Sequence, residues 1–319
     1  MSVAVALLAV IAIAVPHVLR LEGAHPATAA AIWFAALSLR ALVALFCAVF
    51  VVLYLPATAL FGLITHWCWH AVLPVVATHL GLSGHSIGDV ALLAPTLGLA
   101  FSLMSVSFGL WRAARTIRRW VRHTAIGPGP QHSVIVGEHD VVVAAAGFRR
   151  PTVIVSAGAL TTFDDEELAA SLEHERGHIA HRHRFVLASA EVCRSLARLL
   201  PGTRQAVDEL VFHLERDADR WAVERRHEPT ALASAICKAA QRRACHNGAL
   251  LSLSGRGVTR RVGQLLQSGD LPPVRRRRLD VLAVAMTTLV LALGAALPSA
   301  VLAGVDQAGQ SSTVRHCPD

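Results

Sequence analysis

The sequence contains few charged residues for its length. Charged side chains account for 16% of the 319 residues, against 54% that are hydrophobic. This balance lies outside the range of ordinary soluble domains and favours a membrane protein. The stretch from Ala41 to Gly88 contains no Asp, Glu, Lys or Arg at all. Most of the charges lie between an N-terminal apolar block that ends near Trp111 and a C-terminal block from Val281 to Gly304.

The cysteines also lack a pattern. Six are present, and no two of them form a CxxC pair. A disulfide framework is therefore not expected. Cys237 and Cys245 are predicted to be small buried or half-buried residues, because their spacing does not suit a zinc site.

The long apolar stretches predict transmembrane helices, since about 20 apolar residues span a bilayer. We predict four crossings, at residues 2–19, 32–55, 90–111 and 279–304. The first has no basic residue at its start and no clear cleavage site, so we interpret it as a retained anchor and not a signal peptide. Residues 57–80 are predicted to form an outward-facing interfacial loop rich in His and Trp. A further crossing there stays open as an alternative.

Arginines flank the predicted crossings and set their orientation, because Lys and Arg near membrane ends stay on the cytoplasmic side. Five arginines lie between Arg112 and Arg122, just after the third crossing, and four occupy positions 275–278, before the last one. Both ends of the middle domain are therefore predicted to be cytoplasmic. Residues 305–319 would then form a short extracytoplasmic tail.

The net charge of +8 raises the question of nucleic-acid binding. Two of the largest basic clusters flank membrane segments, where anionic lipid is the simpler partner. We therefore expect membrane lipid as a partner and no direct contact with nucleic acid.

The middle of the chain has the pattern of a soluble α+β domain. Residues 112–130 are predicted to be a basic juxtamembrane linker that ends in Gly127-Pro128-Gly129-Pro130, and residues 131–273 the domain itself. Three β-branched runs separated by turn residues predict short strands. They are Ser133–Val136, Val141–Ala145 and Thr152–Val155.

Helices are expected to follow the strands. Thr162 and Asp165 form a capping pattern for a helix over about Phe163 to Phe185. Further helices are predicted from about Thr203 to Glu224 and from Pro229 to Ala244. The segment from Ser252 to Gly257 is expected to be a loop. The predicted fold class is thus a mainly α membrane protein with an inserted α+β domain.

The pentapeptide His174-Glu175-Arg176-Gly177-His178 is the sharpest signal in the sequence. On a helix, positions i and i+4 share a face, so both imidazoles can reach one metal ion with Glu175 beside them. An HExxH match can arise by chance in a chain with 17 histidines. The preceding helix start, the membrane setting and an acidic pattern farther along support a metallopeptidase site.

A catalytic zinc ion takes three protein ligands and keeps one position for water. The position ten residues after His174 is Arg184, which cannot be a ligand. Glu215, on the later predicted helix, is the expected third ligand. Asp219 lies one turn beyond Glu215 on the same face, where its carboxylate can orient one of the metal-bound imidazoles.

Other polar residues near these positions are given ordinary structural roles. Asp217, Glu173 and Glu209 are predicted to be solvated surface carboxylates. His181 shares a face with His174 and His178, but a fourth protein ligand would close a tetrahedral catalytic site. It is therefore expected to face the surface or a loop.

The layout resembles the BlaR/MecR-type membrane metallopeptidases. The resemblance covers about Val134 to Asp219 and is carried by the residues leading into the histidine helix, Gly147-Phe148-Arg149-Arg150-Pro151-Thr152-Val153-Ile154-Val155, and by the HExxH pentapeptide. It implies a zincin domain with a gluzincin-like Zn²⁺ site. The ligands would be His174, His178 and Glu215, with Glu175 as general base and Asp219 in support. His183 departs from the family, in which an acidic residue is found late in this helix.

The resemblance implies a membrane zinc metalloendopeptidase that takes part in signal-responsive proteolysis. Its substrate would be a cytoplasmic transcriptional repressor, the protein itself, or both. Only residues 305–319 follow the last predicted crossing, so no extracellular β-lactam sensor of the family type is expected. Two alternatives stay open: a zinc protease that processes membrane proteins or acts in their quality control, and a non-catalytic zinc-binding sensor. The oligomeric state is open, with a dimer among the options.

Overall fold

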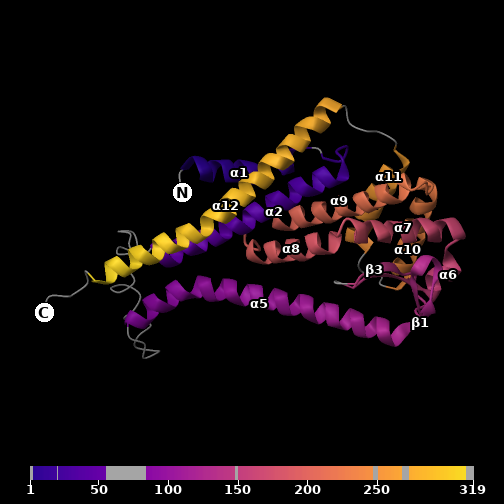
Figure 1. Cartoon of the computed structure of the whole chain (residues 1–319), viewed down its shortest axis with the longest axis horizontal. Coiled ribbons are helices and arrows are strands. Elements are labelled where there is room, and N and C mark those ends of the chain that lie inside the picture. Colours follow the sequence, from indigo (N-terminus) through magenta and orange to yellow (C-terminus); the bar gives the residue numbers. More distant parts are fainter. Residues whose placement is uncertain are drawn as a thin grey trace.

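The computed structural model describes residues 3–19, 21–54, 84–147, 150–246, 251–267 and 273–313. The molecule is elongated (Figure 1), with long helices along its length and a small sheet at one end among shorter helices. The N-terminal helices are α1 (Val3–Val18), α2 (Pro26–Val49) with a π-helical extension η1 (Phe50–Tyr54), and α5 (Gly84–Thr124). The chain then forms β1 (Ala125–Pro128), η4 (Pro130–His132), β2 (Val134–Val136), β3 (Val143–Ala146), β4 (Thr152–Ser156), α6 (Ala157–Thr162), α7 (Asp165–Ala180), α8 (His183–Leu196), α9 (Thr203–Glu224), α10 (Pro229–His246), α11 (Leu251–Leu266) and α12 (Pro273–Thr313).

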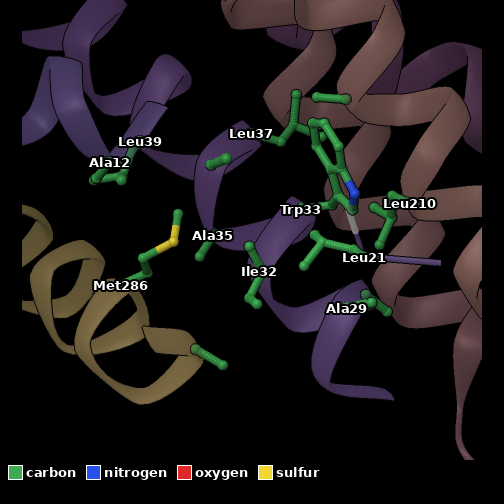
Figure 2. Packing of buried hydrophobic residues seen from close by; sticks show 14 of the residues in the cluster. Ala12, Leu21, Ala29, Ile32, Trp33, Ala35, Leu37, Leu39, Leu210 and Met286 are labelled. Atoms are coloured by element: carbon green, nitrogen blue, oxygen red, sulfur yellow. The ribbon is translucent and has the colours of Figure 1, made fainter. Parts of the chain in front are cut away.

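Helix α2 lies at the centre of the largest apolar cluster. Figure 2 shows its side chains meeting Leu210 of α9 on one side and Met286 of α12 on the other. Trp33 is 3% exposed and packs edge-on against His17 of α1. The N-terminal half of α2 therefore packs between the apolar helices α1 and α12 and helix α9, which carries Glu215 and Asp219.

A buried arginine stabilises the same junction. Arg40 of α2 is 2% exposed and donates hydrogen bonds to the backbone carbonyls of Ala36, Ile13 and Pro201. Its guanidinium also contacts the ring of His17. These bonds tie α1, α2 and the segment before α9 together, since a buried guanidinium must satisfy its donors within the protein.

Two of the described helices are long and apolar enough to cross a membrane, by length and composition. They are Pro26–Val49 and Arg275–Asp306, which correspond to the predicted crossings at 32–55 and 279–304. Half of the most apolar window of the first is buried inside the protein, so this helix also contributes to the core. The predicted crossing at 2–19 forms a helix of only 16 residues. The one at 90–111 lies within α5, and residues 57–80 are outside the described part, so the count of four remains a prediction.

The three predicted strands form, and a fourth joins them. The sheet has the order β1-β2-β4-β3, with β2 parallel to β4 and the other pairs antiparallel. The fourth strand, β1, falls within the predicted linker. There, Ala125, Gly127 and Pro128 pair with Val136, Ile135 and Val134 of β2. β3 is the last strand at one edge of this sheet, next to α7.

Helix α7 lies between the sheet and α9. Leu172 packs with Val153 and Val155 of β4, while Ala170 packs with Ala222 of α9. The helices α9 and α10 match the predicted ranges closely. The predicted loop from Ser252 to Gly257 is wrong, because α11 runs from Leu251 to Leu266. Its Ser and Gly content suggested a loop, whereas packing and ion pairs of its C-terminal half with α9 and α10 favour the helix.

Candidate metal centre

Helix α7 begins at a capping box formed by Asp164 and Glu167. The Asp164 carboxylate accepts the N–H of Glu167, whose own carboxylate accepts the N–H of Asp164. The predicted cap at Thr162 is wrong, because Thr162 is the last residue of α6. The Glu167 carboxylate also binds Lys238 of α10, which fixes the start of the histidine helix against its neighbour.

The predicted continuation of this helix to Phe185 is also wrong. Helix α7 ends at Ala180, Arg182 takes the left-handed conformation with φ 55°, and α8 begins at His183. No glycine or proline marks this break in the sequence. The break lets His181 and His183 approach Asp217 of α9 instead of continuing along the axis of α7.

The structure brings together the three predicted ligands, His174, His178 and Glu215. The two Nε2 atoms of the histidines are 3.2 Å apart. They lie 3.6 Å and 3.4 Å from the Glu215 carboxylate oxygens. Two ligand atoms of tetrahedral zinc, each about 2.0–2.1 Å from the metal, are separated by about 3.3 Å. The donor set and its spacing therefore fit a zinc ion.

Asp219 contacts the far side of one of these imidazoles. Its Oδ1 lies 2.9 Å from Nδ1 of His174 and its side chain is 5% exposed. A carboxylate in this position keeps the proton on Nδ1 and leaves Nε2 free to face a metal. The supporting role of Asp219 toward a metal-bound His174 stays a prediction, and this contact is the geometry that it requires.

The two histidines have opposite pKa shifts. Burial alone would lower the pKa of His174, but hydrogen bonds that its ring donates to Asp219 and Glu215 outweigh burial and raise the pKa to about 9. Burial and the nearby charge of His174 lower the pKa of His178 to about 4. Burial alone would raise the pKa of Glu215, yet its bond to His174 and the charge of Arg261 hold the pKa well below its usual range. Without a metal, the positive charge of this trio therefore lies on His174.

Glu175 is oriented by the edge strand. Its Oε2 accepts the backbone N–H of Ala145 in β3 at 2.7 Å. Burial raises the pKa of the Glu175 carboxyl, and the neighbouring His174 and the Ala145 N–H oppose the rise. A carboxylate with a raised pKa is better suited to accept and return protons near neutral pH.

Arg261 of α11 was not identified from the sequence. Its guanidinium donates to both oxygens of Asp219, at 3.0 Å and 2.6 Å. It also lies 2.7 Å from a Glu215 oxygen. One arginine thus bridges the proposed ligand and the supporting carboxylate. No motif singles it out, and the loop predicted for the start of α11 concealed the helix that presents it.

Gly177, inside the pentapeptide, allows α7 and α9 to approach closely. A Cβ at this position would lie 3.0 Å from Cβ and Cγ of Trp221 on α9. Trp221 cannot move easily, because its Nε1 binds Glu173 and Arg225 stacks on its ring. The small size of residue 177 therefore positions the acidic helix against the histidine helix.

We expect Gly177→Ala to lower the melting temperature. Overpacking costs about 1–3 kcal/mol, which exceeds the gain of up to about 1 kcal/mol from helix propensity. Thermal unfolding of the purified chain in detergent would measure the change. Trp221→Ala removes Cγ and Cδ1 of the ring, so Gly177→Ala should lower the melting temperature less in the Trp221→Ala background than in the wild type. A higher melting temperature for Gly177→Ala alone would contradict this packing argument.

Of the three residues predicted to be solvated carboxylates, two are buried and the third is half-buried. Asp217 is 5% exposed and Glu173 is 8% exposed. Asp217 contacts His181 and His183, while Glu173 binds Trp221, Arg176 and Arg225. Glu209 is half-buried and paired with Arg260. The prediction was wrong because their partners come from other elements or from the break after α7.

An HExxH helix facing a carboxylate from a second helix is the arrangement of a metallopeptidase centre. Comparisons with known proteins agree with this class. Residues 112–211 match Peptidase family M48. The chain is also 28% identical over 130 residues to the protein named Protease HtpX homolog of Desulfotalea psychrophila, a match that covers 34% of this chain and 45% of the relative. Both matches indicate a metallopeptidase.

The matches have limited extent. The chain covers less than half of the length of that curated relative. The family match includes the HExxH pentapeptide and stops four residues before Glu215. A comparison with solved structures finds no significant match. Neither match confirms the BlaR/MecR subtype.

Proposed function

We propose that this protein is a membrane-embedded zinc metalloendopeptidase. The observation that carries the proposal is the convergence of His174, His178 and Glu215, whose ligand atoms all lie within 4.8 Å of one another. A zinc ion held there would polarise a peptide carbonyl and lower the pKa of water. Glu175 then acts as general base, taking a proton from the attacking water and passing it to the leaving amine.

The edge strand β3 suggests how a substrate is held. Its outer edge is next to α7, and its Ala145 N–H already points to Glu175. An extended peptide can add to such an edge through main-chain hydrogen bonds. The scissile bond would then lie beside both Glu175 and the ligand trio. This placement favours unfolded or flexible segments as substrates.

The similarity to a protein named Protease HtpX homolog favours processing or quality control of membrane proteins as the biological role. Signal-responsive cleavage of a repressor, or of the chain itself, is the second candidate. It is supported by the sequence from Gly147 to Val155, which carries the resemblance to the BlaR/MecR-type metallopeptidases. Phe148 and Arg149 of this stretch lie outside the described residues. Cleavage of a destabilised membrane protein and of a co-expressed repressor, compared in the same membranes, separates the two roles.

The basic clusters support a cytoplasmic catalytic domain within a multi-pass protein. Arg112, Arg115, Arg119 and Arg122 lie on the C-terminal part of α5, next to the sheet, and Arg275–Arg278 lie in the first turns of α12. Such clusters bind anionic lipid at the cytoplasmic surface. Protease accessibility of a tag placed after residue 319 in sealed vesicles tests this orientation.

The direct test uses the full chain purified in detergent. We expect about one zinc per chain by elemental analysis, and cleavage of casein or an unfolded membrane protein that a chelator abolishes and added zinc restores. Zinc-free protein that still cleaves would refute the proposal. So would chelator-resistant cleavage.

Glu215→Ala should reduce bound zinc well below one per chain, because only two protein ligands remain. The matched control is Glu209→Ala. Glu209 lies on the same helix but pairs with Arg260, outside the ligand trio. Elemental analysis of both variants gives the comparison. Undiminished zinc in Glu215→Ala would remove Glu215 from the ligand set.

A further inference from the structure

A second group of polar side chains lies directly behind His178. Nδ1 of His178 is 2.9 Å from Nδ1 of His183. Nε2 of His183 is 3.1 Å from Oδ2 of Asp217, and the same oxygen contacts Nδ1 of His181. The side chains of His183 and Asp217 are 4% and 6% exposed, while that of His181 is 40% exposed. A continuous chain of contacts therefore leads from a proposed ligand to the protein surface.

We propose that His183 and Asp217 form a positioning relay that holds the metal ligand His178 in its binding tautomer. This inference rests on the proposed function. The relay matches the contact on the other ligand, where Asp219 binds Nδ1 of His174 directly. For His178 an imidazole stands between the ligand and the carboxylate.

The positions of the protons follow from the contacts. A histidine that binds metal through Nε2 is neutral and carries its proton on Nδ1. The Nδ1–H of His178 then donates to Nδ1 of His183, which must be unprotonated. The proton of His183 is therefore on Nε2, where it donates to the Asp217 carboxylate. Each nitrogen along the relay has one role, and Asp217 fixes all of them.

The same proton positions argue against a second metal ion bound by His181, His183 and Asp217. The ligand atoms of His181, His183 and Asp217 lie within 4.8 Å of one another and could hold an ion by themselves. A metal on Nε2 of His183 would force its proton onto Nδ1. Two N–H groups would then face each other across 2.9 Å, with His178 unable to accept. With zinc on His178, the group behind it can only be a relay.

The relay also accounts for two features that sequence patterns did not predict. The helix break at Arg182 places His183 at the start of α8, facing back toward His178. Asp217 lies two residues from both Glu215 and Asp219, so it is not on the helix face that these two share. It is nevertheless buried. Three carboxylates of α9 thus serve the same centre: Glu215 as the proposed ligand, and the other two behind the two imidazoles.

The test measures the zinc affinity of the full chain in detergent by competition with a chromophoric chelator. Loss of such a supporting contact costs about 10–100-fold in metal affinity. We expect a loss of this size for His183→Leu and about 10-fold for Asp217→Asn. His183→Asn should recover most of the loss, because its Oδ1 lies close to the position of Nδ1 and can accept from His178. The visible spectrum of the cobalt-substituted protein should shift in His183→Leu and less in His183→Asn.

A double variant separates a relay from general polar packing. In the His183→Asn background, Asp217→Asn should change zinc affinity less than about 2-fold, because asparagine lacks the Nε2 through which residue 183 contacts Asp217, so that link is already broken. If the two substitutions acted independently on the structure, their separate losses of zinc affinity would add in the double variant. His213→Asn is the control for loss of a buried histidine, since His213 is 1% exposed and bonds to Arg216 away from the relay. It should leave zinc affinity unchanged.

The outcomes are distinct. Wild-type protein that binds no zinc refutes the proposed function itself. Two zinc ions per wild-type chain, one of which is lost in Asp217→Asn, would show a second metal site and overturn the relay. One zinc ion with unchanged affinity in Asp217→Asn, or additive effects in the double variant, would also overturn the relay while leaving the peptidase proposal intact.

Discussion

Glu175→Gln should reduce peptide cleavage by about 10²–10⁴-fold, the usual contribution of a general base. Zinc content should not change, because Glu175 is not among the three converging ligands. Glutamine keeps the size of the side chain and an oxygen that can accept the Ala145 N–H, so the fold around the site is preserved. The loss would therefore report proton transfer. Cleavage rate and zinc per chain should be measured on the same preparation.

Glu173→Gln is the matched control. Glu173 lies on the same helix and is 8% exposed, but it binds Trp221 and Arg176 away from the ligand trio. Its substitution should leave the rate per zinc-loaded chain nearly unchanged. Full cleavage by zinc-loaded Glu175→Gln would exclude Glu175 as the base. If cleavage of every substrate is absent in wild type too, a zinc-binding sensor becomes the better description.

Much of the candidate site could be predicted from the sequence because its features are local. Helical periodicity alone places His174 and His178 on one face, and the same argument places Glu215 and Asp219 together. The β-branched runs predicted β2, β3 and β4. The α9 pattern predicted a helix that begins near Thr203 and ends near Glu224. In each case the signal lies within a few residues of the feature that it predicts.

Features that depend on partners from elsewhere in the chain could not be predicted in this way. β1 forms although Gly127 and Pro128 are poor strand residues, because β2 offers it a partner. The break at Arg182 has no glycine or proline signal and is accompanied by contacts of His181 and His183 with Asp217. Arg261, which follows Asp219 by 42 residues in the sequence, reaches the site from α11.

Hydropathy has a similar limit in the membrane region. It predicted apolar helices correctly around residues 32–49 and 279–304. It could not tell which of their faces meet protein and which meet lipid. Ile32, Ala36 and Leu37 are fully buried in a cluster with residues of α8, α9 and α12, not exposed on an outer face. An apolar run shows only that a segment avoids water, and both a protein core and a lipid bilayer exclude water.

Arg261→Met should lower the free energy of unfolding of the metal-free protein by about 3–5 kcal/mol. Arg261 is 16% exposed and is bonded to Asp219 and to Glu215. Its removal leaves two largely buried carboxylates without the guanidinium that bridges them. Breaking a buried ion pair from one side costs about 3–5 kcal/mol. Thermal unfolding in the presence of a chelator would measure the effect.

Arg260→Met is the control on the same helix. Arg260 is 35% exposed, pairs with Glu209 and Glu22, and stacks on Phe212. Exposed ion pairs and one cation–π contact together account for about 1–2 kcal/mol. Arg261→Met should therefore destabilise the protein clearly more than Arg260→Met. Equal effects would mean that Arg261 contributes no more than an ordinary surface charge.

Arg261→Lys distinguishes charge from geometry. Lysine restores the positive charge but cannot form the two parallel bonds that a guanidinium makes with Asp219. We expect it to recover less than half of the stability lost in Arg261→Met. Added zinc should also recover only part of that loss, since Glu215 regains a cation at the ligand trio while Asp219 does not regain its two bonds to the guanidinium. Full recovery by zinc would mean that Arg261 serves Glu215 and that its bonds to Asp219 contribute little.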